Sequence, residues 1–261
     1  MFPDVRAKTA RYYELGPNST PKDINFYKNL IRRPEMTVLE LGCGTGRILV
    51  PLAHSCAYIQ GIDSSPAMLD ICRERLEAAR IGPDRAAVVL GDMCGIALGR
   101  KFGLIIAPYR VMQNLETNEQ VHGMLRCIRS HLAADGTCVL NAFNPNRDKD
   151  RMRREWCREG EMFMWSVPYD EGRVEHYEAF REMDQEGCIL YPELIYRRFV
   201  GEQMVEETIM KIPMRCWWPR DFEGLLVDHG FTILNKWGGY AGEPYGQESE
   251  LVIEFADGRA S

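Results

Sequence analysis

The feature that most constrains the fold of this chain is an apolar strand that runs directly into a glycine-rich loop and then into a helix. The segment reads Val38-Leu39-Glu40-Leu41-Gly42-Cys43-Gly44-Thr45-Gly46-Arg47. Glycines at alternate positions allow the backbone to turn sharply and to approach a ligand closely at the start of a helix. The segment is therefore typical of a loop that binds a nucleotide.

The spacing within this loop distinguishes three classes of nucleotide-binding site. The dinucleotide fingerprint requires a further glycine where Arg47 stands. A P-loop requires Gly-Lys-Ser/Thr at its end, which this loop lacks. What remains is an acidic residue, Glu40, followed by three alternating glycines.

Up to residue 145 the chain alternates short apolar runs with amphipathic stretches, which predicts a parallel sheet with crossover helices. The expected strands are Thr37–Leu41, Ala57–Ile62, Ala86–Leu90, Gly103–Pro108 and Thr137–Phe143. The expected helices are Arg47–Ala53, Pro66–Arg80 and Glu119–Leu132. The fold class is therefore α/β.

From Glu161 onward the hydrophobic period becomes that of strands joined by short polar loops, which predicts antiparallel neighbours. The strand-like segments are Met162–Val167, Val174–Met183, Cys188–Phe199 and Val205–Met214, preceded by a charged helix or linker over Arg147–Glu161. A helix from Pro219 and two strands, Phe231–Trp237 and Glu250–Phe255, complete the chain. We expect one domain over residues 1–261, with residues 146–218 as an antiparallel insertion that covers the active site.

Two further acidic residues follow the expected strands after the glycine loop. Asp63 ends the second strand, and Asp92 follows the third. A carboxylate after the second strand can accept hydrogen bonds from both hydroxyls of a ribose. The alternative is that both residues are helix caps or turn formers, which Asp often is.

Together these motifs resemble the class I S-adenosylmethionine-dependent methyltransferases, and most closely their small-molecule branch. Motif I corresponds to Glu40–Gly46, and the segments Tyr109–Leu115, Asn141–Pro145 and Asp228–Phe231 also look like that branch. The resemblance implies a Rossmann-like seven-stranded sheet, mostly parallel with the last strand antiparallel, and an antiparallel β insertion over the active site. Two departures stand out: Ala134-Asp135-Gly136 replaces the usual Pro-Gly-Gly, and Ala107-Pro108-Tyr109-Arg110 lacks the Asn/Asp-Pro-Pro-Tyr of amino-methyltransferases of DNA.

The resemblance also implies a set of cofactor contacts, in which Asp63 holds the ribose and Asp92 the adenine amine. An N-terminal helix with a tyrosine folds over the cofactor in that family, so Tyr12 or Tyr13 is a candidate lid contact and Arg11 a partner for the methionine carboxylate. The alternative is that these tyrosines pack two short helices. The full expected set is Tyr13, Glu40, Gly42, Cys43, Gly44, Asp63, Ser64, Met68, Asp92, Met93, Pro108 and Gln113.

The candidates for acceptor contacts and catalysis lie in and around the insertion. The catalytic group is unknown, with His176 and Tyr109 as candidates, although a strand histidine beside Glu175 and Glu178 is more often an exposed polar residue. Trp217 and Trp218 cannot both face inward on an extended segment. The candidate acceptor contacts are Tyr12, Arg110, Asn144, Arg215, Trp217 and Tyr240.

Charge and motif content exclude several other classes of function. The formal net charge of −6 disfavours nucleic acid as a partner. The sequence has no C-x-x-C and no H-E-x-x-H, so we expect no metal site. No apolar run reaches the roughly 18 residues of a membrane span, and the N-terminus lacks the pattern of a secretory signal, so we expect a cytoplasmic protein without membrane contact.

The sequence therefore predicts an enzyme that moves the methyl group of S-adenosylmethionine to nitrogen or oxygen of a small-molecule acceptor, without a metal. We expect the cofactor to supply the activated methyl group and the protein to supply binding, alignment and exclusion of water. The alternatives are a non-catalytic S-adenosylmethionine-binding protein of the same fold, or an NAD-dependent enzyme, which the missing glycine disfavours. A monomer and a homodimer are equally compatible with the sequence.

Overall fold

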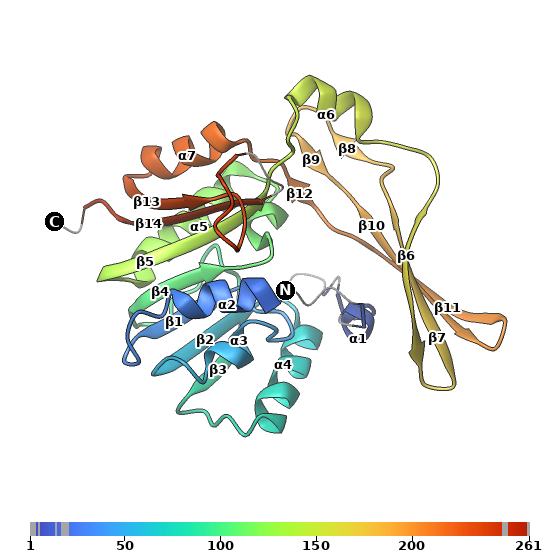
Figure 1. The fold of residues 1–261 in the computed structure, drawn as a ribbon, viewed down its shortest axis with the longest axis horizontal. Helices are drawn as coiled ribbons and strands as arrows, with labels where there is room; N and C mark the ends of the chain where they lie inside the picture. Colours follow the sequence, from blue (N-terminus) through green and yellow to red (C-terminus); the bar gives the residue numbers. More distant parts are fainter. Residues whose placement is uncertain (1–3, 5, 14, 17–20, 247–249, 260–261) are drawn as a thin grey trace.

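The computed structural model describes residues 4, 6–13, 15–16, 21–246 and 250–259 (Figure 1). A seven-stranded sheet and a separate antiparallel sheet dominate these residues, and the N-terminal helix α1 (Ala10–Tyr13) lies between the two (Figure 1).

The seven-stranded sheet has the order β13-β14-β5-β4-β1-β2-β3. Strands β1 to β5 pair in parallel, whereas β14 is antiparallel to both of its neighbours. The expected mostly parallel sheet with an antiparallel last strand is therefore confirmed. Its strands are β1 (Thr37–Leu41), β2 (Tyr58–Asp63), β3 (Ala86–Leu90), β4 (Phe102–Ala107), β5 (Leu132–Phe143), β13 (Phe231–Trp237) and β14 (Glu250–Asp257).

Helices cover both faces of this sheet and bury two separate apolar clusters. On one face α5 (Asn118–His131) and α7 (Pro219–Asp228) pack on the sheet, and on the other α2 (Pro21–Asn29), α3 (Leu49–Leu52) and α4 (Pro66–Ala78) do so. The start of α4 is fixed locally, because the Ser65 hydroxyl accepts a hydrogen bond from the Met68 N–H and Pro66 occupies the first turn. The sheet is thus buried on both sides, as a parallel sheet requires.

The expected antiparallel segments form a second sheet of their own, in the order β11-β10-β7-β6. Its strands are β6 (Met162–Tyr169), β7 (Gly172–Ala179), β10 (Glu193–Val200) and β11 (Gln203–Lys211). A small third sheet contains β8 (Met183–Asp184), β9 (Ile189–Leu190) and β12 (Met214–Arg215), and the charged segment before β6 contains the short helix α6 (Lys149–Glu155).

Three of the predicted long strands are interrupted. Pro192 lies between β9 and β10, and Pro213 lies between β11 and β12. Proline has no N–H to donate to a strand ladder, so each break falls where pairing cannot continue. After β7 the backbone turns toward another partner, because the Phe180 carbonyl accepts a hydrogen bond from the Arg158 N–H (2.9 Å).

Hydrogen bonds join the insertion to the rest of the protein, and two groups of them lie on β11 and just before β12. On β11, Glu206 accepts hydrogen bonds from Tyr12 (2.8 Å) and Arg11 (2.6 Å) of α1. Before β12, the Pro213 carbonyl accepts from Asn114 Nδ2 (2.8 Å), at the end of the 3-10 helix η1 (Val111–Asn114). These contacts support our prediction that residues 146–218 fold only as part of a single domain.

Candidate functional site

A cavity of about 470 Å³ lies between the carboxyl ends of the parallel strands and the inner face of the insertion. Such edges are where open α/β proteins bind ligands. From the core, its walls include the glycine loop, Asp63, Met68 and the loop after β4. From the insertion and its flanks, its walls are Trp156, Arg158, Trp165, His176, Glu178, Phe180, Pro192, Leu194, Tyr196, Ile212 and Met214.

The glycine loop presents bare backbone to this cavity. Gly42 and Gly44 have positive φ angles of 69° and 52°, a region that L side chains rarely adopt. A Cβ on Gly42 would lie 2.2 Å from Val111 Cγ2, whereas a Cβ on Gly44 would meet no atom within 4 Å. Gly42 is therefore required for packing, and Gly44 leaves open space for a ligand.

Asp63 connects this loop to the end of β2. Its Oδ2 accepts a hydrogen bond from the Gly44 N–H (2.8 Å), and its Oδ1 accepts from the Ser65 N–H (2.9 Å). The carboxylate also lines the cavity. Ser65 is the N-cap of α4, so Asp63 does not cap this helix, but its hydrogen bond from the Ser65 N–H is the turn-forming contact that the alternative named.

Glu40, the acidic residue of motif I, is only 2% exposed at the base of the cavity. Its Oε2 atom has no hydrogen-bond partner among the described residues. Burial raises the pKa of this carboxyl well above its usual range, Cys72 adds to the effect, and the Arg47 guanidinium opposes it. This buried carboxyl thus keeps its proton to higher pH than a free glutamate does.

The wild type is expected to lose stability as pH rises because of Glu40, and Glu40→Gln is expected to abolish this pH dependence. The folded pKa lies above the unfolded value of 4.5, so the folded state holds a proton that the unfolded state releases, and stability falls as pH rises from 4.5 through the folded pKa. The thermal midpoint is measured without ligand from pH 4.5 upward. The midpoint of the variant should increase relative to that of the wild type as pH rises.

Glu206→Gln is the matched control with the opposite sign. Burial alone would raise the pKa of Glu206, but hydrogen bonds from Tyr12 and Arg11 and the charge of Arg11 lower it. Its contribution to stability is present above pH 4.5 and is lost as pH falls through the folded pKa. In a series extended below pH 4.5, the thermal midpoint of this variant should therefore fall relative to that of the wild type as pH rises to 4.5, and the difference should stay constant above pH 4.5. Parallel curves for Glu40→Gln and the wild type would contradict the prediction.

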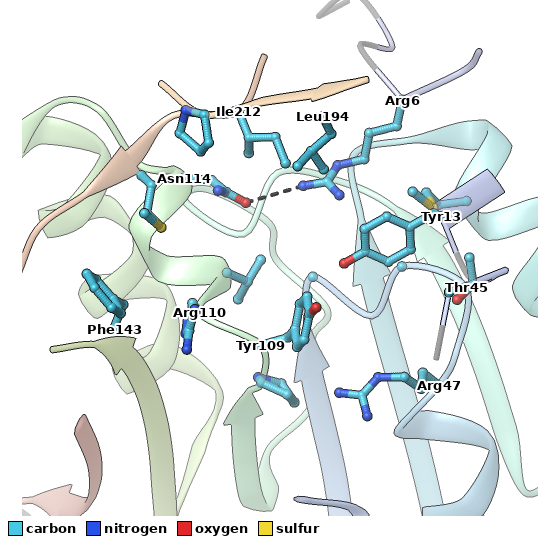
Figure 2. A pocket seen from close by; sticks show the side chains of 18 of the residues that line it. Arg6, Tyr13, Thr45, Arg47, Tyr109, Arg110, Asn114, Phe143, Leu194 and Ile212 are labelled. Atoms are coloured by element: carbon cyan, nitrogen blue, oxygen red, sulfur yellow. Dashed lines mark hydrogen bonds between the residues drawn. The ribbon is translucent and has the colours of Figure 1, made fainter. Parts of the chain in front are cut away.

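The N-terminal segment contributes Arg6 and Tyr13 to the cavity, as Figure 2 shows. Arg6 Nη2 donates to Asn114 Oδ1 (3.3 Å), and its guanidinium lies 5.9 Å from the centre of the Tyr13 ring. Arg11 and Tyr12 instead point to Glu206 on the insertion. Of the two candidate lid tyrosines, the structure therefore brings Tyr13 to the cavity and packs Tyr12 elsewhere.

The loop after β4 reaches the cavity through two consecutive residues with positive φ angles, Tyr109 (55°) and Arg110 (62°). Non-glycine residues in this region carry strain and are concentrated at functional sites. Arg110 is held by an ion pair with Glu250, which also accepts from Asn141 Nδ2 (2.6 Å). Tyr109 stays 53% exposed at the opening of the cavity.

Arg47 occupies the position where a dinucleotide site would need glycine, and it lines the same cavity (Figure 2). Its guanidinium makes two hydrogen bonds to the buried Asp23 carboxylate of α2 (3.0 and 2.6 Å), and its charge lies 5.2 Å from the centre of the Tyr109 ring. Arg47 thus ties α2 to the glycine loop.

The insertion faces the cavity with an aromatic row on three neighbouring strands. His176 on β7 is in register with Trp165 on β6 and Tyr196 on β10. The imidazole stacks on the Tyr196 ring at 4.6 Å between centres, and its Nε2 lies 3.7 Å from Glu178 Oε1. His176 is only 5% exposed, so the expectation that a strand histidine between two glutamates is an exposed polar residue is wrong.

Four of the expected cofactor residues lie outside the walls of the cavity. Ser64 and Asp92 are exposed, and Asp92 Oδ1 accepts a hydrogen bond from the Cys94 N–H (2.8 Å), the turn-forming alternative. Met93 packs against the apolar core. Gln113 is fully buried and holds the Arg215 carbonyl (2.6 Å) and the Phe143 N–H (2.6 Å).

Of the six candidate acceptor contacts, the structure brings only Arg110 to the cavity. Trp217 is buried in the core, and Tyr240 packs against Tyr27. Asn144 is buried and donates to Asn146 Oδ1 (2.8 Å). Arg215 donates to Asn118 Oδ1 (2.5 Å), and Tyr12 is bonded to Glu206 as described above.

Sequence reasoning missed several wall residues, among them Arg6, Asn114, Trp165 and Tyr196. The alternation of inward and outward side chains along the predicted strands was a usable signal for Trp165 and Tyr196, because strand register aligns them with His176. No local pattern marks Arg6.

Within the described ranges, no group of three or more His, Cys, Asp or Glu side chains is placed to hold a metal ion. The expectation of a reaction without metal stays a prediction. None of the helices in the described part of the chain has the length and apolar character needed to cross a membrane.

Residues 38–136 match a family model described as a methyltransferase domain. A dTDP-3-amino-3,6-dideoxy-alpha-D-glucopyranose N,N-dimethyltransferase from Streptomyces fradiae is 28% identical over 144 residues, which are 52% of this chain and 54% of the relative. A cypemycin N-terminal methyltransferase from a Streptomyces species is 27% identical over 219 residues, 83% and 81% of the two chains. This chain thus spans about half the length of the first relative and most of the second.

Among solved structures, the CcbJ methyltransferase from Streptomyces caelestis superposes with a TM-score of 0.77 at 22% identity, over 97% of this chain and 98% of the other. Other neighbours of this fold were solved with S-adenosylmethionine or sinefungin. The expected Rossmann-like fold and the methyltransferase domain are confirmed.

Proposed function

We propose that this chain, which carries an S-adenosylmethionine-dependent methyltransferase domain, transfers the methyl group to an amino group of a small molecule. The observation that carries this proposal is the single cavity, whose walls are the glycine loop with Asp63 on one side and the aromatic row of the insertion on the other. One cavity is thus available for both the cofactor and the acceptor.

For the cofactor, we assign the core side of the cavity to the expected contacts that line it. They are Tyr13, Glu40, Gly42, Cys43, Gly44, Asp63, Met68 and Pro108. Asp63 would accept hydrogen bonds from the ribose hydroxyls, and the bare backbone at Gly44 would lie against the methionine portion.

For the methionine carboxylate, we propose Arg6 in place of Arg11. Arg47 and Arg110 also line the cavity, but their charges are paired with Asp23 and Glu250. The hydrogen bond found for Arg6 goes to the neutral side chain of Asn114, so its positive charge is not compensated by that contact. An arginine in this state favours a bound carboxylate.

Nitrogen is the proposed acceptor atom because the two relatives described above are both named for methylation of amino groups. The insertion side of the cavity suits such an acceptor, since Glu178 contributes a carboxylate and Trp165 and Tyr196 contribute aromatic faces. Carboxylates and aromatic faces both attract ammonium groups.

The chemistry needs little beyond alignment. Bound S-adenosylmethionine supplies an activated methyl group, and the chain must hold the acceptor nitrogen in line with the methyl–sulfur bond and exclude water. Such positioning is worth about 7 to 11 kcal/mol of the barrier. The bulky side chains of the insertion wall, among them Trp165, Phe180 and Tyr196, serve both purposes.

Calorimetry with S-adenosylmethionine, S-adenosylhomocysteine and NAD tests the cofactor assignment. We expect the first two ligands to bind and NAD not to bind. Turnover is then measured as S-adenosylhomocysteine release with dTDP-3-amino-3,6-dideoxy-alpha-D-glucopyranose and other primary amines as acceptors. Binding of the cofactor with no turnover on any amine would favour the non-catalytic alternative.

A further inference from the structure

We infer that His176 accepts the proton that the acceptor ammonium must lose, and that Glu178 stabilises the charged imidazole that results. This inference rests on the proposed function, because it needs S-adenosylmethionine and an amine in the same cavity. An ammonium group has no lone pair, so a nitrogen acceptor has to be deprotonated before it can attack the methyl group.

The placement of His176 fits a group that acts on a ligand. It is 5% exposed, it lines the cavity, and it lies in the centre of the aromatic row, in register with Trp165 and Tyr196. Its ring is stacked on Tyr196, with 19° between the planes, and lies 5.1 Å from the ring centre of Trp165. The imidazole is therefore fixed in orientation by packing on two sides.

The hydrogen bonds of the ring define which nitrogen can take a proton. Nδ1 lies 3.2 Å from the Ile195 carbonyl oxygen, which can only accept, so Nδ1 carries the hydrogen of the neutral ring. Nε2 then has a free lone pair. The nearest acid to Nε2 is Glu178, whose Oε1 lies 3.7 Å away. A backbone carbonyl that fixes the tautomer is a recurrent feature of histidines that work as bases.

The groups that surround this ring include one nearby carboxylate and several cations. Glu178 on β7 is in register with Leu194 on β10 and lines the cavity beside His176. The other titratable group against the ring is the Tyr196 hydroxyl, whose pKa is raised by burial and so stays neutral at physiological pH. The other charged walls of the cavity are the acids Glu40 and Asp63 and the arginines Arg6, Arg47, Arg110 and Arg158. The arginine charges oppose a protonated imidazole, but those of Arg47 and Arg110 are paired with Asp23 and Glu250.

The step balances with these groups alone. The N–H bond of the ammonium breaks and its proton forms a bond to Nε2 of His176, which leaves an amine lone pair and an imidazolium beside Glu178. The amine nitrogen then bonds to the methyl carbon while the methyl–sulfur bond breaks, and that electron pair stays on sulfur. The methylated nitrogen carries the positive charge, and the imidazolium returns its proton to water.

The test is an NMR titration of the histidine ring signals, carried out on the full chain with S-adenosylmethionine or S-adenosylhomocysteine bound. The two ligands differ by one positive charge at the sulfur. If Nε2 lies beside the transferring methyl group, the midpoint of His176 should shift to lower pH by about half a unit or more with S-adenosylmethionine, because a unit charge within the same cavity disfavours the imidazolium. The signal is assigned by its absence in His176→Gln.

Two variants make the result specific. Glu178→Gln should shift the His176 midpoint to lower pH with either ligand, because it removes the stabilising carboxylate. His54→Gln, an exposed histidine outside the cavity, should leave the His176 titration unchanged. If His176→Gln does not fold, the His176 signal is identified as the histidine signal whose midpoint Glu178→Gln shifts. The absence of any such signal then overturns the inference.

The inference is overturned if the His176 midpoint is the same with both ligands, or if Glu178→Gln leaves it unmoved. It is also overturned if the neutral ring carries its hydrogen on Nε2, which the nitrogen chemical shifts report directly. Failure of the proposed function is a different result, since in that case neither ligand binds in calorimetry and no turnover with any amine is found.

Discussion

Asp63→Ala is expected to lower the affinity for S-adenosylmethionine at least tenfold. The carboxylate stands at the end of β2, lines the cavity and is held by the N–H groups of Gly44 and Ser65. Hydrogen bonds from ribose hydroxyls to a charged acceptor contribute roughly 1.5 to 3 kcal/mol each. Since about 1.4 kcal/mol is a factor of ten, the loss of even one such bond gives the expected change.

The measurement is the dissociation constant by calorimetry together with the denaturation midpoint. Asp70→Ala is the matched control, because Asp70 is exposed on α4 and pairs only with Arg73 among the ion pairs of the described residues. Its affinity should equal that of the wild type. If Asp63→Ala keeps its affinity and only its midpoint falls, Asp63 is a structural residue that orders the glycine loop and the ribose assignment is lost.

Gly44→Ala is expected to weaken cofactor binding by at least tenfold while the protein remains folded. The backbone at Gly44 has a positive φ, and a Cβ there would enter the open space of the cavity and meet no protein atom within 4 Å. The new methyl group thus occupies volume that a ligand needs. The strain of a non-glycine residue at this φ costs roughly 1 to 2 kcal/mol as well.

Gly99→Ala separates the two effects. Gly99 also has a positive φ (66°), and a Cβ there also meets nothing within 4 Å, but Gly99 does not line the cavity. Both variants should therefore show similar losses in denaturation midpoint, whereas only Gly44→Ala should lose affinity. Equal affinities for the two variants would mean that the cofactor does not approach the glycine loop.

The core of the fold was predictable because its signals are local. Each parallel strand up to residue 145 is a short apolar run with a turn or cap beside it, so β1 and β3 were predicted to the residue. The insertion was predictable as antiparallel but not in its strand limits, because Pro192 and Pro213 end strands that the hydrophobic pattern alone continues.

In the site, too, the residues with a local sequence signal were predictable and those whose roles depend on distant segments were not. The glycine loop and Asp63 come from one stretch of sequence, and they line the cavity as expected. The roles of Gln113 and Trp217 depend on which distant segments meet them, and both became internal packing residues. His176 shows the opposite error, since the acids beside it in sequence suggested an exposed residue, whereas its ring is buried against Trp165 and Tyr196.

The division of the cavity between distant segments has a consequence for synthesis of the protein. The glycine loop and Asp63 leave the ribosome early, whereas the opposing wall ends with Ile212 and Met214. The helix α1, made before the glycine loop, reaches its partner Glu206 only when β11 has been synthesised. A nascent chain that stops before β6 would therefore expose an open half-site to water, so the ability to hold an acceptor is acquired late in translation, well after the glycine loop and Asp63 have been made.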